Sequence, residues 1–296
     1  MTRIVNNCVA LVCLCLFWGQ SLRAADASHS EQIKWGNESV FNEEHNTLGL
    51  FSGVLGGQIV LAGGTSDDYS RWGRNAVCLS ENAGFALYED VLSKPLAYGA
   101  SITLSDGILC IGGRDSSQCY EDVFFVTMQQ GKLNVSEDWP PLPFPLSNAA
   151  GALLDNKVYL FGGRKSVSPS RLSDSFFVLD LSNKSRGWKE LPGYPGCVRE
   201  DAILVVQNNG VSPCLYLLGG QTETEEGLSS CLTDGYVYNP QLGKWSSLGS
   251  DFPKGICAAV ASGANHILLF QKEPEDTQHP VSYTHLRAHE TKANLV

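Results

Sequence analysis

The sequence lacks a long hydrophobic run, a metal-binding motif and any cluster of basic residues. Its longest apolar segment covers residues 8–19, fewer than the roughly 20 residues that cross a bilayer as a helix. No Cys-x-x-Cys pair occurs and the histidines are scattered, which predicts no metal centre. A formal net charge of −10 argues against a nucleic-acid or anionic-membrane surface. The ligand classes that remain are a small molecule and a neutral face of a protein partner.

The N-terminal 24 residues have the pattern of a secretory signal peptide. Arg3 supplies a positive start, residues 8–19 supply an apolar segment, and small residues surround Ala24. An uncleaved membrane anchor is the alternative. We therefore expect an exported, periplasmic protein without membrane attachment after cleavage.

The region after this signal contains an odd number of cysteines. These are Cys78, Cys110, Cys119, Cys197, Cys214, Cys231 and Cys257. An exported location permits disulfides, yet most of these residues lie in apolar strand patterns, where cysteine serves as a small buried hydrophobe. Their disulfide status stays open, as does the oligomeric state.

One segment shows a pattern on which most of the chain is built. Residues 150–163 (AGALLDNKVYLFGG) alternate as a strand, turn at Asp155-Asn156, and return as an apolar strand that ends in two glycines. Residues 174–178 (DSFFV) predict a third strand, and Trp188 marks a short fourth one. Four antiparallel strands of this kind make one blade of a β-propeller.

The pattern recurs along the chain. Glycine pairs end apolar runs at residues 63–64, 112–113, 162–163 and 219–220, so the second glycines lie 49, 50 and 57 residues apart. Tryptophans follow the last three pairs by 26, 25 and 25 residues. A period near 50 with these features is typical of the kelch-type β-propeller, an all-β fold. Glycine allows close approach of neighbouring backbones, and tryptophan covers the gap between sheets. Unrelated hairpins are the alternative.

The repeat predicts about four and a half blades between residues 25 and 280, and six blades in the full-length protein. The predicted blades cover residues 48–92, 98–142, 148–191 and 199–248, with a fifth that begins at 256. In the fifth, Gln271-Lys272 replaces the glycine pair. Trp35 predicts the outer strand of a closing blade whose other strands come from the C-terminus.

Residues 281–296 predict a non-native tail. They begin VSYTHLRAHET, which resembles the translated read-through of a common sequencing-library adapter. A genuine tail is the alternative. We assign no function to its histidines or to Arg287 and Glu290.

Three stretches resemble the cyclically permuted N-acetylneuraminate mutarotases, also called N-acetylneuraminate epimerases. Residues 48–64 (LGLFSGVLGGQIVLAGG) and residues 92–113, with LAYGA and ILCIGG, are similar to two blades of that family. Trp35 falls where the family places a blade-ending tryptophan.

This resemblance implies an isomerase that interconverts the α and β anomers of sialic acid by acid/base ring opening and closing, without a cofactor. Its partner would be a small sugar acid. The family's acid/base glutamate and its arginine lie on the blade after the last one here. The resemblance therefore places the catalytic pair after about residue 280 and implies an inactive fragment.

Candidate substrate-binding residues lie at the start of each innermost strand, around the central channel. They are Phe51, Tyr98, Asn148, Arg199 and Glu200. Arg199 resembles an arginine of the family and is the best partner for the substrate carboxylate, because a guanidinium binds a carboxylate through two hydrogen bonds. A surface arginine paired with Glu200 or Asp201 is the alternative. Tyr98 matches a family tyrosine, but the family's neighbouring arginine is Leu96 here.

Two more arginines could lie near the channel, and two alternative functions are considered. Arg114 and Arg164 follow glycine pairs, either at the channel mouth or in solvated loops. The alternative function is an exported kelch module that binds carbohydrate or protein without catalysis. A copper radical oxidase would need more histidines than the sequence offers.

Overall fold

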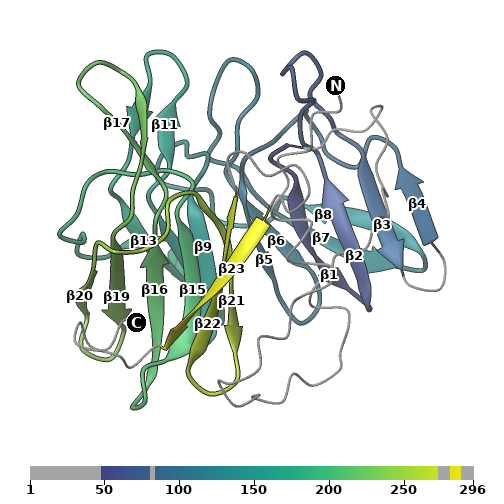
Figure 1. Cartoon of the computed structure of the whole chain (residues 1–296). Coiled ribbons are helices and arrows are strands. Elements are labelled where there is room, and N and C mark those ends of the chain that lie inside the picture. The colour runs from purple at the N-terminus through teal and green to yellow at the C-terminus, as the bar shows by residue number, and fades with distance from the viewer. Residues whose placement is uncertain (1–47, 81–83, 273–280, 288–296) are drawn as a thin grey trace.

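The computed structural model describes residues 48–80, 84–272 and 281–287. The predicted signal peptide, Trp35 and the end of the predicted tail lie outside these residues. Most of the described chain forms antiparallel sheets that stand side by side, with their strands roughly along one direction (Figure 1).

Four of these sheets have four strands each and form blades one to four. Blade one contains β1 (Phe51–Leu55), β2 (Gln58–Ala62), β3 (Ala76–Ser80) and β4 (Gly84–Tyr88). Blade two contains β5 (Ala100–Thr103), β6 (Ile108–Ile111), β7 (Val123–Gln129) and β8 (Lys132–Ser136). Blade three contains β9 (Ala150–Leu154), β10 (Lys157–Phe161), β13 (Phe176–Asp180) and β14 (Lys189–Glu190). Blade four contains β15 (Ile203–Asn208), β16 (Pro213–Leu218), β19 (Gly235–Asn239) and β20 (Lys244–Gly249).

The remaining elements are a fifth sheet, two hairpins and a short helix. The fifth sheet contains β21 (Ile256–Ser262), β22 (His266–Lys272) and β23 (Val281–Arg287). One hairpin is β11 (Arg164–Ser166) with β12 (Arg171–Leu172), and the other is β17 (Gln221–Glu223) with β18 (Ser229–Cys231). The 3-10 helix η1 spans Leu181–Arg186. Among the described residues, no helix has the length and apolar character needed to cross a membrane.

The all-β, kelch-type architecture predicted from the repeat is confirmed. Each predicted hairpin that ends in two glycines forms the inner two strands of a blade. Blade two differs from the prediction in one detail, because its outer strand β8 ends before Trp139. Trp139 instead lies in the following loop, where its ring packs 5.3 Å from that of Phe125. β23 pairs with β22 along its whole length, so it adds a third strand to the fifth sheet.

In blades two, three and four, the second strand is buried on both faces. Alternate residues of such a strand pack against the blade before it and the blade after it. In β10, Val158 and Leu160 belong to a core cluster shared with blade two. Tyr159 and Phe161 belong to a cluster shared with blade four. This period of two explains why the strand is apolar at consecutive positions instead of alternating with polar ones.

The tryptophans seal the joints between blades, as the sequence predicts. Trp245 of blade four lies 5.1 Å from Phe176 of blade three, and Trp188 of blade three donates its indole N–H to the carbonyl of Pro140 beyond blade two. Aromatic rings in such arrangements add to the stabilisation from buried area.

The glycine pairs are the points of closest approach between blades. A Cβ on the first glycine, at position 63, 112 or 162, would lie 2.2, 2.2 or 2.6 Å from a backbone carbonyl oxygen. In each case this oxygen belongs to the segment that leads into the following blade. The second glycine donates its N–H to the same oxygen at 2.8–2.9 Å. These three acceptors are the carbonyls of Leu96, Leu146 and Arg199. The repeat therefore keeps glycine where one backbone rests directly on another.

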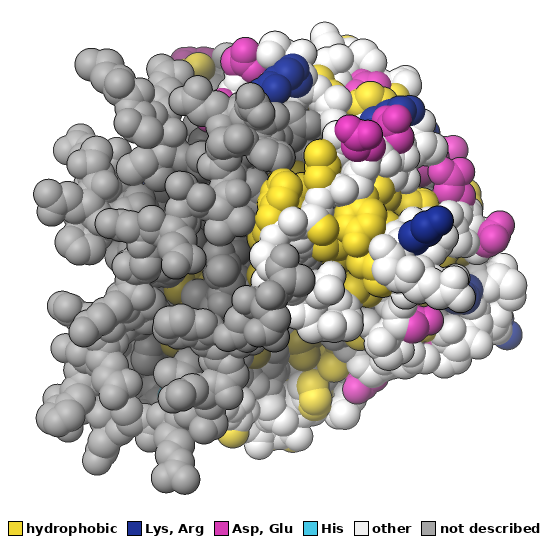
Figure 2. Space-filling view, turned by 90° about the vertical axis from the view of Figure 1, so that its right-hand side faces the viewer, with side chains coloured by type: hydrophobic (Ala, Val, Ile, Leu, Met, Phe, Trp, Pro, Cys, Tyr) yellow, Lys and Arg dark blue, Asp and Glu magenta, His cyan; other side chains and the backbone are white. Residues whose placement is uncertain are grey.

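Blade one lies at one side of the molecule, with β4 outermost (Figure 1). Hydrophobic side chains gather on this side in Figure 2, and on β4 the side chains of Phe85 and Leu87 are 41% and 46% exposed. The inner strands β1, β5, β9, β15 and β21 contact one another in sequence order. The described residues form four blades and a three-stranded fifth sheet. Six blades in the full-length protein therefore remain a prediction.

Candidate functional site

In each of blades one to four, one residue just before the inner strand adopts a left-handed backbone conformation. These residues are Gly49, Tyr98, Asn148 and Asp201, with φ values of 64°, 60°, 54° and 52°. The N–H of each of the last three donates to the carbonyl of the preceding one, at 2.7, 2.7 and 3.0 Å. We call this chain of four residues the inner rim. Non-glycine residues in this conformation are strained, and such strain concentrates at functional sites.

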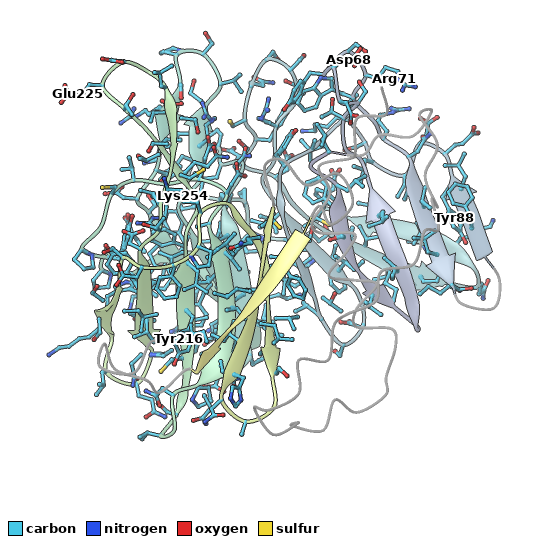
Figure 3. The ribbon with its side chains drawn as sticks, viewed as in Figure 1. Asp68, Arg71, Tyr88, Tyr216, Glu225 and Lys254 are labelled. Atoms are coloured by element: carbon cyan, nitrogen blue, oxygen red, sulfur yellow. The ribbon has the colours of Figure 1, made fainter. Side chains whose placement is uncertain are left out.

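Each rim residue is preceded by a residue that bridges to the position after a glycine pair. The four bridges are Leu48 to Thr65, Ala97 to Arg114, Ser147 to Arg164, and Glu200 to Gln221. Hairpins β11–β12 and β17–β18 extend from this end of the molecule, where Figure 3 also places Asp68, Arg71 and Glu225. The polar side chains of Arg114, Arg164 and Gln221 therefore lie beside the rim.

Asp201 is the acidic residue of the rim. Asn148 Nδ2 donates to one of its carboxylate oxygens at 2.9 Å, and Gln221 Nε2 donates to the other at 3.0 Å. Part of Asp201 is exposed, but protein atoms crowd the carboxyl group. This desolvation raises the pKa of Asp201 despite the two amide donors, and the charge of Glu200 raises it further. A carboxyl group with a raised pKa can carry a proton nearer neutral pH.

We expect Asp201→Asn to stabilise the fold at neutral pH. Because the folded-state pKa of Asp201 is raised, its contribution to stability is fully present below the unfolded value, about 3.9, and is lost as pH rises through the folded value. Asn148 can accommodate the new amide by turning its own, since its Oδ1 is buried without a partner among the described residues. Urea midpoints at pH 7 and at about pH 4 measure the effect.

The gain should appear at pH 7 and shrink at the lower pH. The exposed Asp251, changed to Asn, is the matched control. An equal loss of stability at both pH values would show that Asp201 serves the fold through its hydrogen bonds alone.

Arg114 lies between two aromatic rings on the other side of the rim. Its guanidinium carbon is 4.6 Å from the Tyr98 ring centroid and 5.2 Å from that of Trp72. Its Nη1 reaches only the carbonyl of Asp115, at 3.4 Å, and its Nε is buried without a partner. Within the described residues it forms no ion pair. Burial of Tyr98, together with its hydrogen bond to Tyr69, raises the pKa of the Tyr98 hydroxyl.

Arg164, one blade later, is neutralised by two glutamates. Its Nε donates to Glu200 at 2.8 Å, and its Nη2 contacts both Glu200 and Glu223, the latter at 3.0 Å. The hydrogen bonds and charges of these glutamates raise the pKa of Arg164 against the opposing effect of burial. Glu200 thus lies beside the rim, and its carboxylate is already paired with Arg164.

Arg199 is completely buried, which corrects the expectation that it faces the channel. Both terminal nitrogens donate to the Asp234 carboxylate at 2.8 Å, Nη1 also reaches the Gly219 carbonyl, and Nε donates to Tyr194. The alternative expectation, a surface pair with Glu200 or Asp201, is corrected as well. Leu96 and Leu146 occupy its position in the two preceding joints and are buried too.

Phe51 is likewise a core residue. It is 1% exposed and packs edge-on against Phe124, with ring centroids 5.3 Å apart. Gly99 leaves the space that its ring occupies. The role of Tyr98, Asn148 and Glu200 in substrate binding stays a prediction, now with a common location beside the rim.

Sequence reasoning missed Asp201 and Gln221 as members of the site, and it did not single out Trp72. A signal for Asp201 existed, because it follows Asn148 by 53 residues and so continues the spacing of Tyr98 and Asn148. No such signal marks Trp72, which comes from an irregular loop of blade one. Within the described residues, no group of three acidic, cysteine or histidine side chains could hold a metal ion, and no disulfide joins the cysteines.

Part of the chain is similar to proteins of one family. A family profile described as N-acetylneuraminate epimerase matches residues 139–273. The chain is 30% identical over 139 residues to an N-acetylneuraminate epimerase from Yersinia pestis (strain Pestoides F), covering 45% of this chain and 33% of the relative. A protein of the same name from Haemophilus influenzae (strain PittEE) is 31% identical over 131 residues, covering 44% and 32%. The aligned part thus spans about a third of these curated relatives.

Two further comparisons concern the fold. A kelch domain-containing protein from Vibrio cholerae is 30% identical over 141 residues, covering 47% of this chain and 36% of that protein. A solved structure, "Structure of YjhT", superposes with a TM-score of 0.60 over 80% of this chain and 83% of that one. At 14% identity, this last similarity shows the fold alone.

Proposed function

We propose that this chain, whose residues 139–273 match the profile of the N-acetylneuraminate epimerase family, comes from a sialic acid mutarotase. The substrate would be a small sugar acid, N-acetylneuraminate, whose α and β anomers are interconverted without a cofactor. We further propose that the protein works after export to the periplasm. The observation that carries the catalytic proposal is the position of Asp201 on the inner rim, where Asn148 and Gln221 hold its carboxyl group by one hydrogen bond each.

The reaction needs two proton-transfer groups. A base removes the proton of the anomeric hydroxyl, the bond between the anomeric carbon and the ring oxygen breaks, a carbonyl forms, and an acid protonates the ring oxygen. Ring closure on the other face reverses these steps, so no proton is gained or lost overall. Asp201 can serve as one of the two groups, because Asn148 and Gln221 orient it and its raised pKa suits proton exchange.

The second group is expected in the glutamate and arginine that the sequence resemblance places after about residue 280. Nuclear magnetic resonance can follow the interconversion of the anomers of freshly released sialic acid. The two samples to compare are the 296-residue chain and a longer protein that includes the expected glutamate and arginine. We expect the longer protein to accelerate mutarotation, and Asp201→Asn to slow it roughly 100-fold.

Two outcomes would redirect this proposal. Binding of sialic acid without acceleration by the longer protein would favour the alternative, an exported kelch module that binds carbohydrate. Acceleration that is unchanged by Asp201→Asn would leave the function standing and remove Asp201 from the proton-transfer step.

A further inference from the structure

Arg114 and Arg164 occupy the same position in successive blades but have opposite electrostatic surroundings. Both follow a glycine pair and both bridge to the residue just before the rim. Arg164 has two carboxylate partners, whereas Arg114 has none within the described residues. In a chain with a formal net charge of −10, a half-buried arginine without an acidic partner is unusual. Its charge is available to an anion from outside.

The two rings beside Arg114 hold its guanidinium in place. Trp72 and Tyr98 lie within 6 Å of its central carbon, a range in which an aromatic face attracts a cation. Their centroids are 6.3 Å apart with the planes inclined at 60°, so the rings form a corner beside the cation. The Tyr98 ring is itself fixed over Gly49, where any side chain would collide with it. The guanidinium is thus held in place while most of its hydrogen-bond donors are unused within the described residues.

Those unused donors indicate the kind of anion. Within the part of the chain that the structure describes, the buried Nε has no partner, Nη1 makes one long hydrogen bond, and Nη2 makes none. The two terminal nitrogens of such a guanidinium can offer parallel N–H groups, the geometry that a planar carboxylate accepts. Adjacent aromatic rings provide an apolar surface for the carbon face of a sugar. A sugar acid combines both features in one molecule.

We propose that Arg114, Trp72 and Tyr98 form the carboxylate subsite for the sugar acid, in place of the buried Arg199. This assignment rests on the proposed function for the identity of its ligand. The subsite and Asp201 lie on the same rim, since the backbone of Tyr98 accepts from Asn148 and Asn148 contacts Asp201. In N-acetylneuraminate the carboxylate is attached to the anomeric carbon. Anchoring it at Arg114 therefore brings the reacting centre to the rim.

Titration of the 296-residue chain with N-acetylneuraminate and with its methyl ester tests the assignment of the carboxylate subsite. The ester keeps the sugar but lacks the negative charge. We expect Arg114→Ala to weaken binding of the acid roughly 10- to 100-fold, with little change for the ester, because a charged hydrogen-bonded pair is lost. Arg114→Lys should give an intermediate loss, since it keeps the charge without the paired donors.

Controls separate this inference from a folding defect and from the proposed function. Arg171→Ala removes an exposed arginine from β12 and should bind like the parent. Circular dichroism and thermal unfolding check that each variant folds. If the parent binds sialic acid and Arg114→Ala binds it equally well, or loses acid and ester equally, the subsite is refuted while the function stands. If the parent binds neither compound, the subsite in this chain is refuted, and the function is decided separately by the mutarotation assay on the longer protein.

Discussion

Replacing Gly112 with alanine is expected to destabilise the fold by about 3–5 kcal/mol. Its φ of 63° costs an L-residue about 1–2 kcal/mol. The added Cβ would also lie 2.2 Å from the carbonyl oxygen of Leu146, a backbone atom that cannot turn away as a side chain can. Relief requires the joint between blades two and three to widen, which strains or breaks the 2.8 Å hydrogen bond from Gly113 to that oxygen.

The chain offers a matched control for this prediction in Gly219. It is the first glycine of the fourth pair and has a similar φ of 57°, yet its nearest neighbour would be 3.5 Å from a Cβ. Gly219→Ala should therefore cost only the conformational term, about 1–2 kcal/mol. Urea unfolding of both variants gives the comparison. Equal losses would show that backbone conformation, and not contact between blades, explains the glycine pairs.

Arg199→Ala is expected to cost about 3–5 kcal/mol, the range for one partner lost from a buried ion pair. The guanidinium is fully enclosed, and its removal leaves Asp234 with a carboxylate that is only 21% exposed. Because that carboxylate retains some contact with solvent, the lower part of the range applies. Tyr194 would also lose the donor that its hydroxyl accepts.

The preceding joint suggests how to restore this stability. Leu146 and Ser175 occupy the positions of Arg199 and Asp234 one blade earlier. The double variant Arg199→Leu with Asp234→Ser should therefore recover most of the loss, since it leaves no buried charge unpaired and uses the side chains that the preceding joint already packs. A double-mutant cycle measured by urea unfolding gives the coupling. A double variant no more stable than Arg199→Ala would mean that the joint requires the ion pair itself.

The same pair predicts a pH dependence. Burial would raise the pKa of Asp234, but hydrogen bonds from Arg199 and Tyr236 and the charge of Arg199 outweigh it and hold the pKa below its ordinary value. A lowered folded-state pKa contributes stability above the unfolded value, about 3.9, and this contribution is lost as pH falls through the folded value. The double variant should lose less stability than the parent between pH 5 and pH 2.

Several features of the fold were readable from residues 150–163 and their repeats. Alternation of apolar residues, turn residues and glycine pairs are local properties, and they determine strands and hairpins without knowledge of distant neighbours. The close approach at each glycine pair followed from the same reasoning, because glycine alone fits beneath a neighbouring backbone.

The position and the partners of each of these arginine side chains depend on residues far away in the sequence. Arg199 turns inward because Asp234, 35 residues later, lies across the joint, and Arg164 is neutralised by Glu200 and Glu223, 36 and 59 residues away. Arg114 has the same place in the repeat as Arg164 but meets two aromatic rings. Strand pattern is set by local chemistry, whereas the partner of a charge is set by which loops the packed blades bring together, and only the tertiary structure decides that.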